Sequence, residues 1–344
     1  MGLSPAHLRG RLGNRGLAAA AGLLVVLVVL FATPQLLGTR VAAAFGTLDQ
    51  ANAKWLWLAG VGFALAVVGA AGSWRSAVGL CGGRLSLADA CARYGAGSLV
   101  NTFVPARAGD AVRIGLFSRV LPHRERLWTT GSAFAALGAA RALVIAVLVV
   151  AGAVAGFVPL WPLLVALTLV AAAVAATLRA RSRPAAGRVS HLLDAFRALG
   201  RRPSGAVRIV TWVALSTAGR LAAATAVGAA LGIHRPLAAA VVIVPALDIA
   251  GLVPLTPGNM GVTSGAIALA FQAHGTSFTH GLAAGIAFHA VETAVGLMFG
   301  LASLVWLAPY PTPGVRRVAL LATAASWSVG IAGAFSATVL VPLV

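Results

Sequence analysis

The chain has 344 residues, of which 60% are hydrophobic and only 10% are charged, and its formal net charge is +19. Soluble domains carry about 25% charged residues, so this composition excludes an ordinary water-soluble protein and indicates an all-α, polytopic helical membrane protein. The basic residues lie in short segments between apolar runs, as in cytoplasmic loops, so the charge favours anionic lipid headgroups over nucleic acid as a partner.

Seven apolar segments are long enough to cross a membrane as helices, each needing about 20 residues. The first follows an arginine-containing arm and is longer than the apolar core of a signal peptide, so we predict an uncleaved helix, with cleavage near 42–44 as the alternative. The predicted spans are 17–38, 55–79, 128–157, 160–178, 208–232, 281–307 and 318–341.

Two further apolar regions, 86–121 and 237–274, are interrupted by proline and glycine, which stop helices. Each has a second leg, 110–121 or 262–274, that reaches only about 18–20 Å of a core about 30 Å thick. Broken backbone at membrane depth is tolerated where protein or a wet cavity receives it, so we predict two re-entrant helical hairpins. Pairs of short spans are the alternative, and charge does not separate the two arrangements.

The distribution of basic residues predicts the orientation. Of the 26 lysines and arginines, 19 lie in the N-terminal arm, the flanks of the first hairpin, the loop 179–208 and the pair Arg316–Arg317. Cytoplasmic loops carry this excess, so we expect the N-terminus in the cytoplasm and the C-terminus outside the plasma (inner) membrane.

Two parts of the chain share one order of elements. Residues 55–178 and 208–341 both read as span, hairpin, span, span, and they enter the membrane from opposite sides. We therefore predict a single transmembrane domain over 1–344, built as an inverted repeat, with 16–38 as an extra N-terminal helix. The alternative is a chance likeness between two halves of a helical protein.

The tip of the first predicted hairpin is polar. A proline and a glycine would end one helix and begin the next, and a carboxylate suits the positive end of the second helix. Free backbone N–H groups beside two guanidinium groups would receive a phosphate; an interfacial cap with arginines extending to the headgroups is the alternative. The candidate residues are Asn101, Pro105, Arg107, Gly109, Asp110 and Arg113.

The second predicted hairpin combines a carboxylate with a glycine-containing tip. A carboxylate in an apolar leg costs about 2.5–3.5 kcal/mol and needs a partner, and glycines allow a headgroup to approach the backbone. A simple helix break capped by the carboxylate is the alternative. The candidate residues are Asp248, Pro254, Thr256, Pro257, Gly258 and Gly261.

Four ionisable residues lie within predicted spans, where such side chains rarely face lipid: Arg141, Arg220, His289 and Glu292. Candidate pairs are Arg141 with Glu292, on equivalent spans of the repeat, and Arg220 with Asp248. His289 and Glu292 are three positions apart and share a helix face. Ion pairs that fix helix register, a simple hydrogen bond and a proton relay are all consistent with these positions.

The pattern Asn-x-x-x-Pro-x-Arg-x-Gly-Asp-x-x-Arg at 101–113 resembles the first signature of the lysylphosphatidylglycerol synthase transmembrane, or flippase-like, family. Pro254-x-x-Pro257-Gly258-x-x-Gly261-Val262 resembles its second signature, although the family has an acidic residue soon after. The resemblance implies a membrane domain associated with lipid translocation. It does not imply aminoacyl-lipid synthesis, which in the family belongs to a soluble domain that we do not expect after Val344.

Together these features predict a flippase-like integral membrane protein that translocates or binds an anionic lipid or lipid-linked intermediate. The arginines would hold the phosphate, and Asp248 and Glu292 would balance charge or carry protons. The alternative is a non-transporting scaffold that presents lipid to a separate glycosyltransferase or synthase. A membrane enzyme is disfavoured because no nucleophile–base pair is apparent. We predict no catalytic residue, metal site or cofactor, and no nucleic-acid partner.

Overall fold

The computed structural model describes residues 51–104, 108–122, 126–157, 203–250 and 260–308. All regular structure within these ranges is α-helical. The predicted spans at 17–38, 160–178 and 318–341 lie outside the described residues, and so do the central residues of both predicted hairpin tips.

Within the described residues, four helices are long and apolar enough to cross a membrane. They confirm the expectation of a multi-pass helical protein, and they match the predicted spans at 55–79, 128–157, 208–232 and 281–307. All four observed helices begin earlier than predicted. At two of these ends a capping side chain, Asn52 for α3 and Ser277 for α12, accepts a backbone N–H group and extends the helix. Their bounds are α3 Ala53–Leu80, α6 Arg126–Val154, α9 Pro203–Ala230 and α12 Phe278–Leu307.

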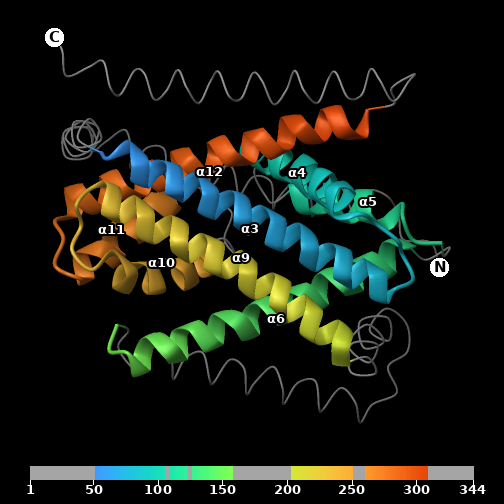
Figure 1. The fold of residues 1–344 in the computed structure, drawn as a ribbon, viewed down its shortest axis with the longest axis horizontal. Helices are drawn as coiled ribbons and strands as arrows, with labels where there is room; N and C mark the ends of the chain where they lie inside the picture. The colour runs from blue at the N-terminus through green and yellow to red at the C-terminus, as the bar shows by residue number, and fades with distance from the viewer. Residues whose placement is uncertain (1–50, 105–107, 123–125, 158–202, 251–259, 309–344) are drawn as a thin grey trace, which may run out of the picture.

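Two pairs of shorter helices lie at opposite ends of this bundle (Figure 1). One pair is α4 (Leu87–Phe103) and α5 (Ala108–Ser118), and the other is α10 (Pro236–Ala250) and α11 (Met260–Ala273). The longest of the four, α4, has 17 residues. At 1.5 Å per residue that is about 25 Å, less than the ~30 Å of a membrane core.

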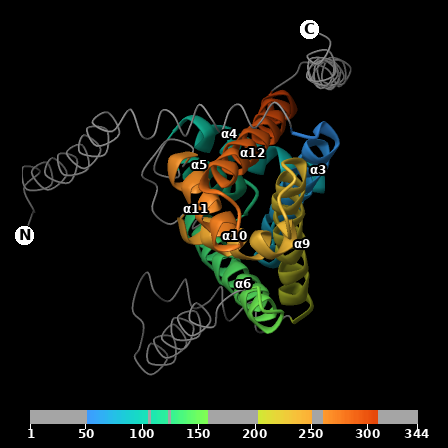
Figure 2. The same cartoon turned by 90° about the vertical axis from the view of Figure 1, so that its left-hand side faces the viewer.

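The directions of the long helices follow from Figure 1. Helix α3 runs toward the end of the bundle where α4 and α5 lie, and α6 begins at that same end and runs back. Helix α9 runs toward the end where α10 and α11 lie, and α12 begins there and runs back. Helix α9 is therefore antiparallel to α3, and α12 is antiparallel to α6. Figure 2 views the bundle from the end that carries α10 and α11.

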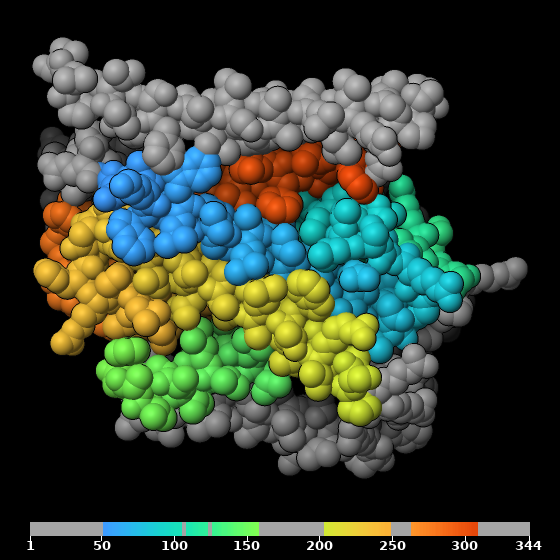
Figure 3. Space-filling model, viewed as in Figure 1, coloured from blue at the N-terminus to red at the C-terminus, as the bar shows by residue number. Residues whose placement is uncertain are grey.

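Helices α3 and α9 pack closely along most of their length, as the space-filling view in Figure 3 shows. Glycines make this approach possible. A Cβ atom on Gly219 would lie 2.6 Å from an α3 carbonyl oxygen and 2.7 Å from an α3 backbone nitrogen. A Cβ atom on Gly69 would lie 2.9 Å from an α9 carbonyl oxygen and 2.6 Å from an α9 nitrogen. Small residues serve this purpose between membrane helices, where dispersion contacts hold the backbones together.

These contacts repeat at a fixed interval in the sequence. Gly219 of α9 contacts Gly62 and Ala66 of α3, and Gly69 of α3 contacts Trp212 and Ser216 of α9. Each residue of the first contact differs by 150 in number from its equivalent in the second. The equivalent pairs are Gly69 with Gly219, Ala66 with Ser216, and Gly62 with Trp212.

The turns that end α3 and α9 repeat at the same interval. Gly82 and Gly232 adopt left-handed conformations, with φ of 88° and 66°. In each turn the residue after the glycine donates its N–H to the carbonyl five positions earlier, at 3.0 Å and 2.9 Å. Glycine suits this helix ending because it has no Cβ to clash. Two segments distant in sequence therefore share helix length, contact positions and turn geometry.

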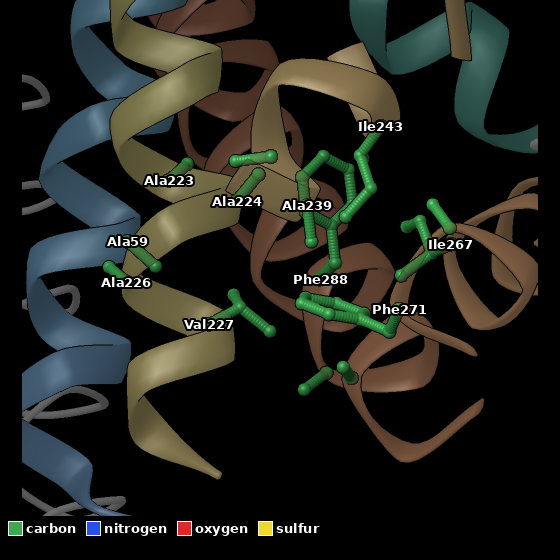
Figure 4. Close-up of a cluster of buried hydrophobic side chains, with 14 of the residues drawn as sticks. Ala59, Ala223, Ala224, Ala226, Val227, Ala239, Ile243, Ile267, Phe271 and Phe288 are labelled. Atoms are coloured by element: carbon green, nitrogen blue, oxygen red, sulfur yellow. The ribbon is translucent and has the colours of Figure 1, made fainter. Parts of the chain in front are cut away.

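The described residues form two apolar core clusters, one beside each short helix pair. Figure 4 shows the cluster formed by α3, α9, α10, α11 and α12, where Val227, Phe271 and Phe288 are buried. In the other cluster, Trp74 of α3 stacks on Phe117 of α5 with ring centroids 4.7 Å apart. Each cluster fixes a short pair against the long helices.

We expect Gly219→Ala to destabilise the protein, because a methyl group there cannot avoid the α3 backbone. Overpacking of this kind costs about 1–3 kcal/mol. Gly138→Ala in α6 is the matched control, since a Cβ atom there meets nothing within 4 Å. Thermal unfolding of purified protein in detergent measures both; equal melting temperatures for the two variants would contradict the close α3–α9 contact.

Candidate functional site

Four charged side chains from four helices form one ion-pair cluster: Arg141 of α6, Arg220 of α9, Asp248 of α10 and Glu292 of α12. Arg141 donates from Nε to Asp248 Oδ2 at 2.8 Å, and its Nη2 donates to Oδ1 of the same carboxylate. Arg220 donates to Glu292 Oε1 at 2.8 Å and lies 3.4 Å from Asp248 Oδ1. Arg220 therefore bridges the two carboxylates.

The cluster lies at mid-depth of the bundle. Arg141, Arg220 and Glu292 lie near the centres of helices of 29, 28 and 30 residues. At 1.5 Å per residue, each is about 15 Å or more from either end of its helix. An unpaired charge at that depth would be costly, which explains why both arginines and both carboxylates have partners.

The pairing differs in part from the sequence expectation. The predicted contact between Arg220 and Asp248 is present at 3.4 Å. The other predicted pair is wrong, because Arg141 contacts Asp248 and Glu292 contacts Arg220. The reason is the position of α10. It packs against both α6 and α9, and this places Asp248 within hydrogen-bonding distance of Arg141.

The members of the cluster differ in exposure. The side chain of Arg141 is 45% exposed, whereas that of Asp248 is only 16% exposed. Arg220 and Glu292 are intermediate. A further anion could therefore reach the cluster at Arg141. Its guanidinium can donate two parallel hydrogen bonds to either a carboxylate or a phosphate.

His289 lies one turn before Glu292 on the same face of α12. Its Nδ1 is buried, has no hydrogen-bond partner, and lies 3.9 Å from Glu292 Oε2. That distance is too long for a hydrogen bond.

Helices α4 and α5 are joined by polar residues of their own. Asn101 near the end of α4 accepts the Gly109 N–H through its side-chain oxygen at 2.7 Å, which satisfies a free N–H at the start of α5. A Cβ on Gly109 would lie 1.9 Å from the Gly97 carbonyl oxygen. Only glycine permits this approach of α5 to α4.

Arg113 is held between the same two helices. It donates to Asp110 at 2.5 Å and to the Ser98 hydroxyl at 2.8 Å, and its guanidinium lies 3.9 Å from the centre of the Tyr94 ring. A third N–H points to the Tyr94 carbonyl at 3.4 Å. The side chain is only 11% exposed. In this geometry Arg113 joins α5 to α4.

The remaining candidates of the two tips fall at or beyond the described residues. Gly261 belongs to the first turn of α11. The others lie outside the described residues: Pro105, Arg107, Pro254, Thr256, Pro257 and Gly258. The structure brings Arg141, Arg220, Asp248, His289 and Glu292 together, and separately Asn101, Gly109, Asp110 and Arg113.

Sequence reasoning missed Tyr94 and Ser98. Both lie on α4 and, with Asn101, occupy positions i, i+4 and i+7, which share one face of a helix. That spacing was a readable signal of a polar face turned toward the second leg. In the described part of the chain, no three His, Cys, Asp or Glu side chains are grouped so as to hold a metal ion.

We expect Glu292→Gln to lower stability, because it leaves Arg220 with a single, longer contact to Asp248. Breaking a buried pair costs up to about 3–5 kcal/mol. Adding Arg220→Gln should recover part of the loss, and adding Arg141→Gln should recover less, because Arg141 does not contact Glu292. Melting temperatures of the single and double variants in detergent measure this, and equal recovery from both arginines would contradict the observed pairing.

Comparison with known proteins agrees with the sequence signatures. Residues 18–300 match the family described as the lysylphosphatidylglycerol synthase TM region. No curated protein and no solved structure matches the chain. The match covers most of the 344 residues and confirms the resemblance inferred from the two motifs. The chain therefore belongs to the lysylphosphatidylglycerol synthase TM region family, and it is a multi-pass membrane protein related to lipid handling.

Proposed function

We propose that the protein is a flippase-like transporter that binds an anionic lipid, or a lipid-linked intermediate, and moves it between leaflets. The observation that carries the proposal is the ion-pair cluster at mid-depth, with the half-exposed Arg141 at its edge. Ionisable groups within a membrane are costly and commonly mark a substrate pathway. Membership of a family related to lipid handling supports a lipid as the substrate.

The proposal includes an inverted repeat of α3–α6 and α9–α12. Its support is the 150-residue interval between equivalent contacts of α3 and α9, and between Gly82 and Gly232. A second support is the packing pattern. The counterparts are α3 and α9, α4 and α10, α5 and α11, and α6 and α12. For each of the main helix–helix contacts, the pair formed by the counterpart helices is also in contact. Inverted repeats are a common basis for alternating access, with the substrate site near the midplane between the halves.

The proposal also treats α4–α5 and α10–α11 as re-entrant hairpins. The helices are short, and each pair lies at the end of the bundle where one long helix ends and the next begins. The two hairpins would then open toward opposite sides of the membrane. With the N-terminus in the cytoplasm, as the arginines predict, α4–α5 opens to the cytoplasm and α10–α11 to the outside.

In the proposed mechanism a lipid phosphate takes the place of Asp248 at Arg141. A phosphate offers the same two-oxygen geometry as a carboxylate, so Arg141 could exchange one for the other while Asp248 keeps its contact with Arg220. Arg107 at the first tip, and Thr256 with the glycines of the second tip, are proposed to guide the headgroup. Asn101, Gly109, Asp110 and Arg113 are proposed to hold the first hairpin in the required shape.

Leaflet exchange in reconstituted liposomes tests this function. Purified protein is reconstituted with fluorescent phosphatidylglycerol as an anionic probe and with fluorescent phosphatidylcholine as a zwitterionic control, and a membrane-impermeant quencher reports the accessible fraction. Exchange of the anionic probe beyond that in protein-free liposomes supports transport. Binding without exchange would overturn transport and favour the scaffold that presents lipid to a separate enzyme.

We expect Arg141→Gln to reduce exchange of the anionic probe by about tenfold or more, because charge-assisted hydrogen bonds contribute about 1.5–3 kcal/mol. Arg208→Gln is the matched control, since Arg208 is exposed near the start of α9 and lies outside the ion-pair cluster. The rates are compared after normalising to folded protein. Equal rates for the two variants would place the substrate elsewhere.

A further inference from the structure

We propose that the ion-pair cluster takes up one proton, at His289, together with the anionic headgroup. This inference rests on the proposed function and names how the same site is regulated. A hydronium ion in solution would give its proton to the imidazole, so that one O–H bond breaks, one N–H bond forms and a neutral water molecule is left. The imidazolium then carries an N–H at Nδ1, which donates to Glu292 Oε2 once the two side chains move closer than the 3.9 Å seen here.

The geometry leaves a place for this proton. Glu292 uses Oε1 for Arg220, and its Oε2 faces the buried, unpartnered Nδ1 of His289 at 3.9 Å. A neutral imidazole that points a lone pair at a carboxylate gains nothing from the contact. An imidazolium carries hydrogens on both nitrogens, so it would donate to Glu292 whichever nitrogen held the first proton. Imidazole is also the side chain that ordinarily titrates near neutral pH.

Charge balance gives the reason for coupling. Two arginines and two carboxylates make the cluster neutral when His289 is uncharged. A phosphodiester headgroup brings one negative charge to a depth where net charge is costly. One added proton restores neutrality.

His289 is a better acceptor for this proton than Asp248 is. Before the headgroup binds, both Asp248 oxygens accept hydrogen bonds from Arg141. After it takes their place at Arg141, Asp248 still keeps the positively charged Arg220 beside one oxygen, which favours its charged form. The buried Nδ1 of the imidazole has no hydrogen-bond partner, and 9% of the side chain is exposed.

Among the described residues, the charged groups around His289 and Glu292 from the neighbouring helices are Arg220 of α9, Asp248 of α10 and Arg141 of α6. Tyr94 of α4 acts electrostatically on Arg220. One turn before His289, Ser264 of α11 lies against Gly285, and Phe63 of α3 packs on Phe288.

Binding of short-chain phosphatidylglycerol to the full chain in phosphatidylcholine nanodiscs tests the inference. The probe is a phosphodiester and keeps one negative charge between pH 5.5 and 8. We expect its affinity to rise on acidification, by at most about tenfold per pH unit because one proton is linked to binding. In weakly buffered solution a pH-indicator dye should report uptake of close to one proton per lipid bound.

His289→Gln should remove both the proton uptake and the pH dependence, and leave affinity at the value of the unprotonated protein. His234→Gln is the matched control, since His234 is exposed in the turn between α9 and α10, and it should retain both effects. If His289→Gln fails to fold, absence of proton uptake by the unaltered chain still overturns the inference.

The outcomes separate the two proposals. Affinity that is independent of pH, without proton uptake, would overturn the inference and leave lipid binding intact. Proton uptake that persists in folded His289→Gln would also overturn it, by moving the proton to another group. Absence of binding to the anionic probe at every pH would overturn the proposed function, and the proton coupling with it.

Discussion

A charge at mid-depth of a membrane has to be paired within the protein, and this constraint accounts for the arrangement of α6, α9, α10 and α12. Arg220 pairs with carboxylates on two helices, and Asp248 accepts from arginines on two helices. No helix can rotate or slide without unpairing a charge from a neighbour. The ion-pair cluster therefore sets the register of four helices, in a setting where apolar surfaces alone specify register weakly because lipid tails are equally apolar.

Close packing of α3 against α9 supplies the frame for that cluster. Glycines at the crossing bring the two backbones together, and the Ser216 hydroxyl donates to the Ala66 carbonyl at 2.8 Å across it. Arg220 follows Gly219 directly in the sequence. The close contact of Gly219 with α3 therefore also fixes the backbone position from which the Arg220 side chain reaches the two carboxylates. Packing and electrostatics are coupled at adjacent positions of one helix.

The long helices could be predicted from the sequence because hydropathy over about 20 residues depends only on local composition. The break between α4 and α5 could be predicted for the same reason, since proline and glycine act locally. The pairing of Arg141 could not, because its partner is 107 positions away and the choice between Asp248 and Glu292 depends on how α10 sits against α6. The sequence predicts Arg113 as one of two guanidinium groups that would receive a phosphate, because a sequence displays a charge without showing the acceptors around it. Only the turn of α4 that presents Tyr94 and Ser98 reveals that these acceptors are already close.

Equivalent positions of α4 and α10 carry different residues, and this difference separates the roles of the two pairs of short helices. Ser98 of α4 and Asp248 of α10 are 150 positions apart, the interval that relates α3 to α9, and each accepts hydrogen bonds from arginine. Ser98 is neutral and serves Arg113 within its own hairpin, whereas Asp248 is charged and serves arginines of α6 and α9. The first hairpin is therefore closed by contacts that it supplies itself. The second is held through ion pairs with the long helices, and those pairs are the ones that an anion at Arg141 would weaken. Under the proposed function, a ligand at Arg141 would loosen α10 while α4 and α5 stay joined, so the two pairs of short helices would take unequal parts in the movement.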